Sequence, residues 1–175
     1  MNDIHPTRTV LTSHEAMTAL KVAWRAVFSN DPTTDQLALL WAQSALETGR
    51  FKSIWNYNFG NIKQTDDHDY YMIRCDEYIA GKHVWLDPPD RGTWFNAYES
   101  AEAGAIEYIN FLANKHNYQA CWQEVINGDP IAFCHQLKLA HYYTADEASY
   151  TKGVVSLFNE IKKDIESTNT DDIYS

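Results

Sequence analysis

The sequence predicts a mainly helical α+β protein with one small β lobe. Apolar residues recur at helical spacing in several segments, and capping residues mark where some of these segments begin. A single stretch, residues 70–87, indicates two short strands ahead of a pair of prolines. The 175 residues suit one domain. We therefore expect a flexible arm over residues 1–12, one folded domain over 13–166 and a flexible tail over 167–175.

The first helix is expected over residues 13–29, and Asn30-Asp31-Pro32 forms the turn that follows it. Thr33 and Gln36 stand three residues apart as a capping box, so a second helix begins there. Its apolar residues predict one buried stripe, formed by Leu37, Leu40, Trp41, Ser44 and Ala45. Gly49 lies where a left-handed C-cap is expected, which ends this helix just after Glu47.

An irregular loop is expected over residues 50–69, followed by strands near 70–78 and 82–87 that join around Ala80-Gly81. Pro88-Pro89 ends the second strand, because proline cannot donate a hydrogen bond to a ladder. Four helices complete the chain, expected over residues 100–115, 118–126, 130–140 and 146–166. The third of these has Asp129 as N-cap and Pro130 in its first position.

Glu47 is placed as a general acid would be. It lies in the last helical turn, where unpaired carbonyls carry partial negative charge and disfavour its ionised form. Apolar neighbours such as Phe51 and Trp55 raise the pKa of a carboxyl in the same direction by desolvation. A carboxyl that stays protonated near neutral pH can protonate a leaving group. Spacing alone favours an ordinary solvated glutamate at a helix end.

Charge and composition exclude some functions. The net charge is −10 and no cluster of Lys and Arg offers phosphate contacts, which argues against a nucleic-acid partner. The same charge counts mildly against tight adhesion to any anionic polymer. Phe, Trp and Tyr make up 14% of the residues, enough for both a core and an aromatic-lined cleft.

The cysteines and histidines predict neither a disulfide framework nor a cofactor. Cys75, Cys121 and Cys134 are odd in number and form no CxxC pair, which favours folding in a reducing compartment. His135 and His141 are six residues apart, not the four that place two imidazoles on one helix face. The acidic string over residues 66–69 lacks the glycine and the final glutamate of a calcium loop. We expect no metal.

Five segments together resemble the bacterial glucosaminidase family of peptidoglycan hydrolases, which includes flagellar-rod-associated hydrolases and autolysins. They are ALETG (45–49), NYNFGNIK (56–63), CDEYIAGKHVW (75–85), FNAYES (95–100) and AHYYTADEASY (140–150). The resemblance covers roughly residues 33–160 and implies a lysozyme-like fold, with a small β-hairpin lobe beside a substrate groove. The chain differs from the commoner family sequence in two places. Asn61 is inserted between Phe-Gly and Ile-Lys, and the last of the five segments is longer than usual in the family.

The resemblance implies roles for three residues. Glu47 is the general acid, and Glu77 is the second acidic position on the hairpin, acting as base, orienting water or stabilising positive charge on the sugar ring. The position of Glu77 on the strand also fits a residue that only caps the edge of the sheet. Tyr142 matches the family's loop tyrosine, with Tyr143 as the rival. From side-chain chemistry, we expect the remaining substrate contacts from amides and aromatic faces in the 56–63 segment: Tyr57, Asn58, Phe59 and Asn61.

The function implied is hydrolysis of the β-1,4 bond after N-acetylglucosamine in peptidoglycan glycan strands. A lytic transglycosylase or muramidase on the same fold, a non-catalytic wall-binding module, and another amino-sugar polymer such as chitin stay open. No signal-peptide pattern or membrane-spanning run is present, so we expect synthesis in the cytoplasm and no membrane insertion. Action on the cell wall or periplasm then requires release or non-classical export. A phage lysin, virion component or secreted effector would each fit, whereas any export machinery, holin or immunity protein is unknown.

Overall fold

Helix α2 (Thr34–Glu47) runs through the centre of the helical body, and its residues from Leu37 to Ala45 are all buried. The sequence predicted a single apolar stripe on this helix. The helix is instead covered on all sides, because α1 (Ser13–Phe28) and α6 (Glu147–Asp171) pack against it from different directions. The capping box predicted for α2 is present, with the Thr33 hydroxyl accepting from the Gln36 N–H at 3.2 Å.

The computed structural model describes residues 1–65, 68–79 and 82–171, so the predicted turn at Ala80-Gly81 and part of the acidic string at 66–69 lie outside the described residues. Three more helices surround α2 and α6: α3 (Ala101–Asn114), α4 (Gln119–Asn127) and α5 (Pro130–Leu139). Their bounds agree with the sequence to within a residue or two. Helix α6 runs five residues beyond the end expected from its apolar spacing.

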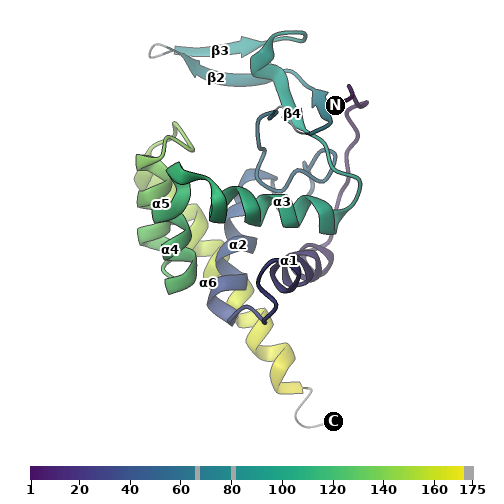
Figure 1. Ribbon diagram of the computed structural model, residues 1–175. Helices are drawn as coiled ribbons and strands as arrows, with labels where there is room; N and C mark the ends of the chain where they lie inside the picture. The colour runs from purple at the N-terminus through teal and green to yellow at the C-terminus, as the bar shows by residue number, and fades with distance from the viewer. Residues whose placement is uncertain (66–67, 80–81, 172–175) are drawn as a thin grey trace.

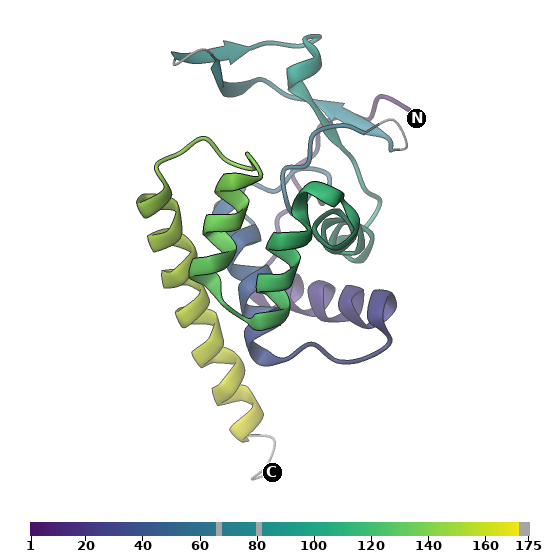
Figure 2. The same cartoon turned by 60° about the vertical axis from the view of Figure 1, so that its left-hand side comes forward.

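The β lobe lies on one side of the helical body (Figures 1 and 2). It holds two antiparallel pairs: β1 (Tyr70–Met72) with β4 (Trp94–Asn96), and β2 (Cys75–Ile79) with β3 (Lys82–Leu86). The sequence predicted one strand over 70–78 and did not predict β4. The single strand is interrupted after Met72, where the chain leaves one partner and joins the other. A 3₁₀ turn (Arg91–Thr93) precedes β4.

The N-terminal segment, for which the sequence predicts a flexible arm, is bonded along its length to the loop before the β lobe. Backbone hydrogen bonds join Ile4 to Tyr70 at 2.7 Å and Thr9 to Ile54 at 3.0 Å. The Thr7 N–H also donates to the side-chain oxygen of Asn56 at 2.9 Å. These bonds link residues 45 or more positions apart, and no local pattern in the sequence signals them.

Among the described residues, one apolar core joins helices α1 to α6, and its largest fully buried side chains include Trp41, Phe51, Phe59, Tyr108 and Phe133. A smaller cluster around Tyr71, Phe95 and Ala97 supports the β lobe. Cys121 and Cys134 are fully buried free thiols, as expected of small core residues. In the part of the chain that the structure describes, no helix is long and apolar enough to cross a membrane.

Candidate active site

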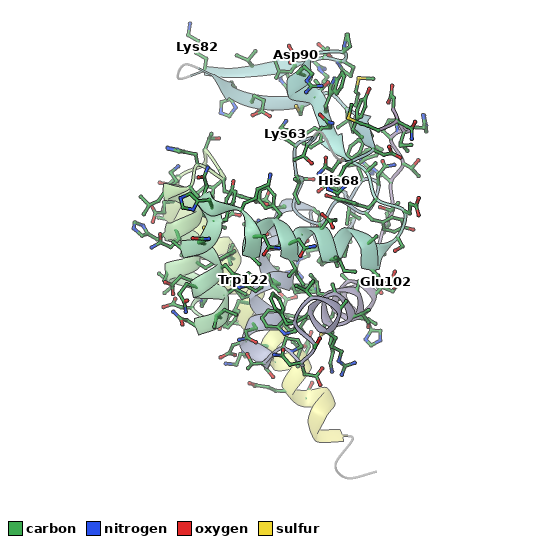
Figure 3. All side chains as sticks on the ribbon, in the orientation of Figure 1. Lys63, His68, Lys82, Asp90, Glu102 and Trp122 are labelled. Atoms are coloured by element: carbon green, nitrogen blue, oxygen red, sulfur yellow. The ribbon has the colours of Figure 1, made fainter. Side chains whose placement is uncertain are left out.

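A cleft of about 1180 Å³ lies between the helical body and the β lobe. Its helical wall includes Glu47, Tyr142 and Tyr150, and its β-lobe wall includes Cys75 and Glu77. Figure 3 shows Lys63 below the β2–β3 hairpin, on the side of the lobe that faces the helices. The cleft therefore brings together Glu47 and Glu77, the two acidic residues that the sequence singled out, from opposite walls.

Glu47 is held in place by the turn that follows it. It is the last residue of α2, and the next residues Gly49, Arg50 and Phe51 all have left-handed backbone conformations, with φ of 57°, 57° and 61°. This conformation is unfavourable for a side chain such as Phe51, and here Phe51 is fully buried between Trp41 and Phe59, at ring distances of 5.5 and 5.8 Å. Core packing thus holds the turn that directs the chain away from Glu47.

The Glu47 carboxyl is surrounded by neutral hydrogen-bond donors. Its Oε1 accepts from the Tyr150 hydroxyl at 2.7 Å and from Nε2 of Gln43 at 3.3 Å. Burial raises the pKa of Glu47 above its ordinary range, while these two hydrogen bonds lower it in part. The sequence predicted this direction, and desolvation is its main cause. None of the described ion pairs includes Glu47.

Tyr150 is the phenol that contacts the acid, and the sequence had placed it only among the apolar positions of the last helix. The available signal was its position as the final residue of AHYYTADEASY, the segment already compared with the family. Its ring stacks on Tyr143 at 3.7 Å with an interplanar angle of 7°. Tyr143 itself donates to the Cys134 carbonyl at 3.0 Å, so it supports Tyr150 and makes no described hydrogen bond to Glu47.

Tyr142 lines the cleft but serves the neighbouring loop. Its hydroxyl donates to the Gly60 carbonyl at 2.7 Å, which ties the segment before α6 to the loop after α2. Burial, and after it the nearby Glu47 carboxylate, raises the pKa of Tyr142 well above its ordinary value. The phenol is therefore close to the acid without being its hydrogen-bond partner.

Of the four side chains that the sequence assigned to substrate contact in NYNFGNIK, the structure places one in the cleft. Asn61 lines it, and its Nδ2 donates to the Glu47 backbone carbonyl at 2.9 Å, which satisfies a carbonyl left unpaired at the helix end. Asn58 and Phe59 are fully buried, and Asn58 bonds the backbone of Ile62. Tyr57 is outside the cleft lining.

The close packing of this loop explains why Tyr57, Asn58 and Phe59 are outside the cleft. The loop around Asn58 is a packed element rather than an exposed one, because the Asn58 amide bridges two chain segments: it donates to the carbonyls of Ile62 at 2.9 Å and Asn96 at 3.0 Å. Phe59 belongs to the core of the helical body. The Tyr57 carbonyl lies against α3, directly under Gly104, so its backbone is turned toward the helix.

Glu77 is held on the cleft wall by Lys63. The Lys63 Nζ lies 2.5 Å from Glu77 Oε1 and 2.5 Å from the Gly92 carbonyl oxygen, and 4.0 Å from the centre of the Phe95 ring. Cys75 Sγ is 3.9 Å from the same Glu77 oxygen, as expected for neighbours on one face of a strand. Lys63 thus links the loop after α2 to the hairpin.

Over the residues that the structure describes, no group of three or more His, Cys, Asp and Glu side chains could hold a metal ion. His135 pairs with Glu147 at 2.9 Å instead, outside the cleft lining.

The sequence matches the family model described as mannosyl-glycoprotein endo-beta-N-acetylglucosaminidase over residues 34–163. The chain belongs to the glucosaminidase family. The match runs from the start of α2 into α6 and so includes every cleft residue discussed above. Family membership makes this chain a glycoside hydrolase. No curated protein matches the chain.

Solved structures of similar fold support this family assignment. A mutant peptidoglycan hydrolase from Sphingomonas sp. A1 is 25% identical with a TM-score of 0.58, and the match covers 84% of this chain and 86% of that one. A C-terminally truncated glycoside hydrolase domain of Salmonella typhimurium FlgJ is 21% identical with a TM-score of 0.52, covering 86% and 98%. The mainly helical, lysozyme-like α+β fold expected from the sequence is confirmed.

Proposed function

We propose that this glucosaminidase cleaves the glycan strand of peptidoglycan at the β-1,4 bond after N-acetylglucosamine, with Glu47 as the general acid. The observation that carries the proposal is the Glu47 carboxyl, which lines the cleft, is desolvated and accepts hydrogen bonds only from neutral groups among the described residues. Such a carboxyl retains its proton toward neutral pH and can transfer it to a leaving glycosidic oxygen. The peptidoglycan substrate rests on the structural likeness to the Sphingomonas hydrolase.

Glu77 is the second carboxylate of the proposed reaction. It faces the same cleft from the β lobe, where it can activate water or stabilise the positive charge that develops on the sugar ring. Lys63 fixes its position through the 2.5 Å ion pair. In a substrate-assisted route the N-acetyl group of the substrate is the nucleophile instead. Glu77 would then orient that group or stabilise the positive charge on the sugar ring.

Glu77 also favours hydrolysis over the alternatives. A lytic transglycosylase needs one acidic residue, and a wall-binding module needs none, whereas here the cleft is lined by Glu47 from α2 and by Asp76 and Glu77 from β2. Because the proposed substrate is outside the cytoplasm, we propose that the enzyme acts on the cell wall after leaving the cytoplasm.

Mass spectrometry of the fragments released from purified peptidoglycan tests this function. Fragments with N-acetylglucosamine at the reducing end are expected. Reducing muramyl ends would assign the enzyme to the muramidases, and anhydromuramyl ends to the transglycosylases. Release from chitin alone would move the substrate to another amino-sugar polymer, and no release from either polymer would favour a binding module.

A further inference from the structure

Gln43 is a fully buried polar residue on α2, one helical turn before Glu47, and it is not part of the cleft lining. Its amide hydrogen-bonds three polar side chains that come from three helices. Nε2 donates to Glu47 Oε1 at 3.3 Å and to the Tyr150 hydroxyl at 3.2 Å. On the other side, the Tyr108 hydroxyl on α3 donates a short hydrogen bond to Gln43 Oε1.

The Tyr108 bond decides which way the amide faces. A glutamine amide can be rotated to exchange its oxygen and nitrogen, and its partners determine the orientation. The Tyr108 hydroxyl donates to Oε1, so the amide nitrogen is the atom directed at Glu47. Tyr108 is itself fully buried and can reach little else, since its only other described acceptor is the Leu40 carbonyl at 3.5 Å.

The consequence for Glu47 is an asymmetry between its two oxygens. Oε1 accepts two hydrogen bonds, from Tyr150 and from Gln43, whereas Oε2 takes part in none of the hydrogen bonds of the described residues. An oxygen that already accepts two donors is a poor site for a proton. The neutral carboxyl therefore carries its proton on Oε2.

We propose that Gln43 is a positioning residue that, together with Tyr108, fixes the Glu47 carboxyl so that Oε2 is the proton-donating oxygen. The proposal rests on Glu47 being the general acid, as proposed above. Gln43 acts only through Glu47 and does not contact substrate, so its loss reduces kcat and leaves KM nearly unchanged.

The groups that face Glu47 keep this arrangement over a wide pH range. They are Gln43 from its own helix, Tyr108 from α3, Tyr142 from the preceding loop and Tyr150 from α6. Burial raises the pKa of each of these three tyrosines well above its ordinary value, so all three phenols stay protonated while Glu47 titrates. Glu47 is then the group of this set that changes charge first as pH rises.

The test uses Gln43→Met, which keeps the length of the side chain and removes the amide, with Ser44→Ala as matched control. Ser44 is the next residue of α2, is also fully buried, and donates a hydrogen bond of 2.6 Å to the Phe59 carbonyl without contacting Glu47. For Gln43→Met we expect kcat to fall about tenfold to a hundredfold, a part of what a general acid supplies. Tyr108→Phe is expected to change kcat in the same direction and by less.

A second readout separates positioning from a structural role. The Gln43 hydrogen bond lowers the pKa of Glu47, so Gln43→Met raises that pKa, measured by NMR of a ¹³C-labelled glutamate carboxyl and assigned with Glu47→Gln. An unchanged pKa, or a loss of kcat equal to that of Ser44→Ala, would overturn the proposal. The NMR titration needs no turnover, so it remains informative if Glu47→Gln proves active and the proposed general acid is wrong.

Discussion

The hydroxyl of Tyr150 donates a 2.7 Å hydrogen bond to Oε1 of Glu47, across 103 positions of the sequence. This bond joins the C-terminal end of α2, the central helix, to the first turn of α6, which packs along it. The ring of Tyr143 stacks on Tyr150 from the loop before α6 and keeps the phenol in register with the acid. The acid is thus positioned by a side chain whose own position depends on the fold of the entire helical body.

Replacing Tyr150 by phenylalanine should reduce kcat by about tenfold to a hundredfold, because the Glu47 carboxylate formed on proton transfer loses a hydrogen bond, and a hydrogen bond to a charged group is worth about 1.5–3 kcal/mol. The ring stack with Tyr143 is retained, so the fold should be unchanged. The Tyr150 hydrogen bond lowers the pKa of Glu47, so the variant should keep its acid protonated to higher pH. The pH–rate profile measures this as a shift of the basic limb to higher pH. Tyr143→Phe, which loses only the bond to Cys134, is the control and should leave that limb in place.

Stability should depend on pH through the same carboxyl. The pKa of Glu47 is higher in the folded than in the unfolded chain, so its contribution is complete below the unfolded pKa and is lost as pH rises through the folded pKa. The Glu47→Gln variant has no titrating carboxyl at this position, so its stability lacks this pH dependence. We expect the Tm of Glu47→Gln to exceed that of the wild type increasingly as pH rises through this window, and a difference that does not change with pH would contradict the assigned burial.

Glu77→Gln should reduce hydrolysis by about a hundredfold or more if Glu77 is the second carboxylate, as expected for a group that acts in proton transfer. Stability should change by only about 0–1 kcal/mol, because the ion pair with Lys63 is partly exposed. Asp87→Asn is the matched control: Asp87 follows β3 in the same lobe, pairs with Arg74 at 3.0 Å and is outside the cleft lining. Full activity in Glu77→Gln would favour an enzyme with a single acidic residue.

Local signals account for the parts that the sequence predicted well. The Thr33–Gln36 capping box and the Asp129-Pro130 helix start use contacts between near neighbours, so residue types alone identify them. The helix end made Glu47 a candidate only, and its proposed role as the acid came from the resemblance of five segments to the family. What failed was the prediction of exposure: Asn58 and Phe59 have side chains suited to sugar binding, but tertiary packing buries both of them.

Long-range pairing was the second limit. Strand β4 has three residues and is recognisable only through its partner β1, more than twenty positions earlier in the chain. The N-terminal residues pair with segments near residues 54 and 70. Tyr150 was visible as an apolar helix position, yet its hydroxyl partner depends on how α6 crosses α2. No periodic pattern in the sequence indicates how these two helices cross.

The tight packing of α3 against the loop after α2 can be tested through Gly104. A Cβ added there would lie 1.9 Å from the Tyr57 carbonyl oxygen, which is backbone and cannot rotate away. Gly104→Ala should therefore cost about 2–3 kcal/mol or more through overpacking, a fall in Tm of about 5–10 °C. Gly153→Ala, which meets only the flexible end of Leu46 at 3.0 Å, should change Tm far less. Equal effects of both substitutions would argue against this contact.

The most direct test of the account is the turnover of purified peptidoglycan by Glu47→Gln, measured with its circular dichroism, Tm and binding to the same substrate. The account predicts a folded protein that binds the polymer and loses at least about a hundredfold in kcat, the lower end of what a general acid contributes. Turnover close to that of the wild type would contradict the assignment of Glu47 as the acid.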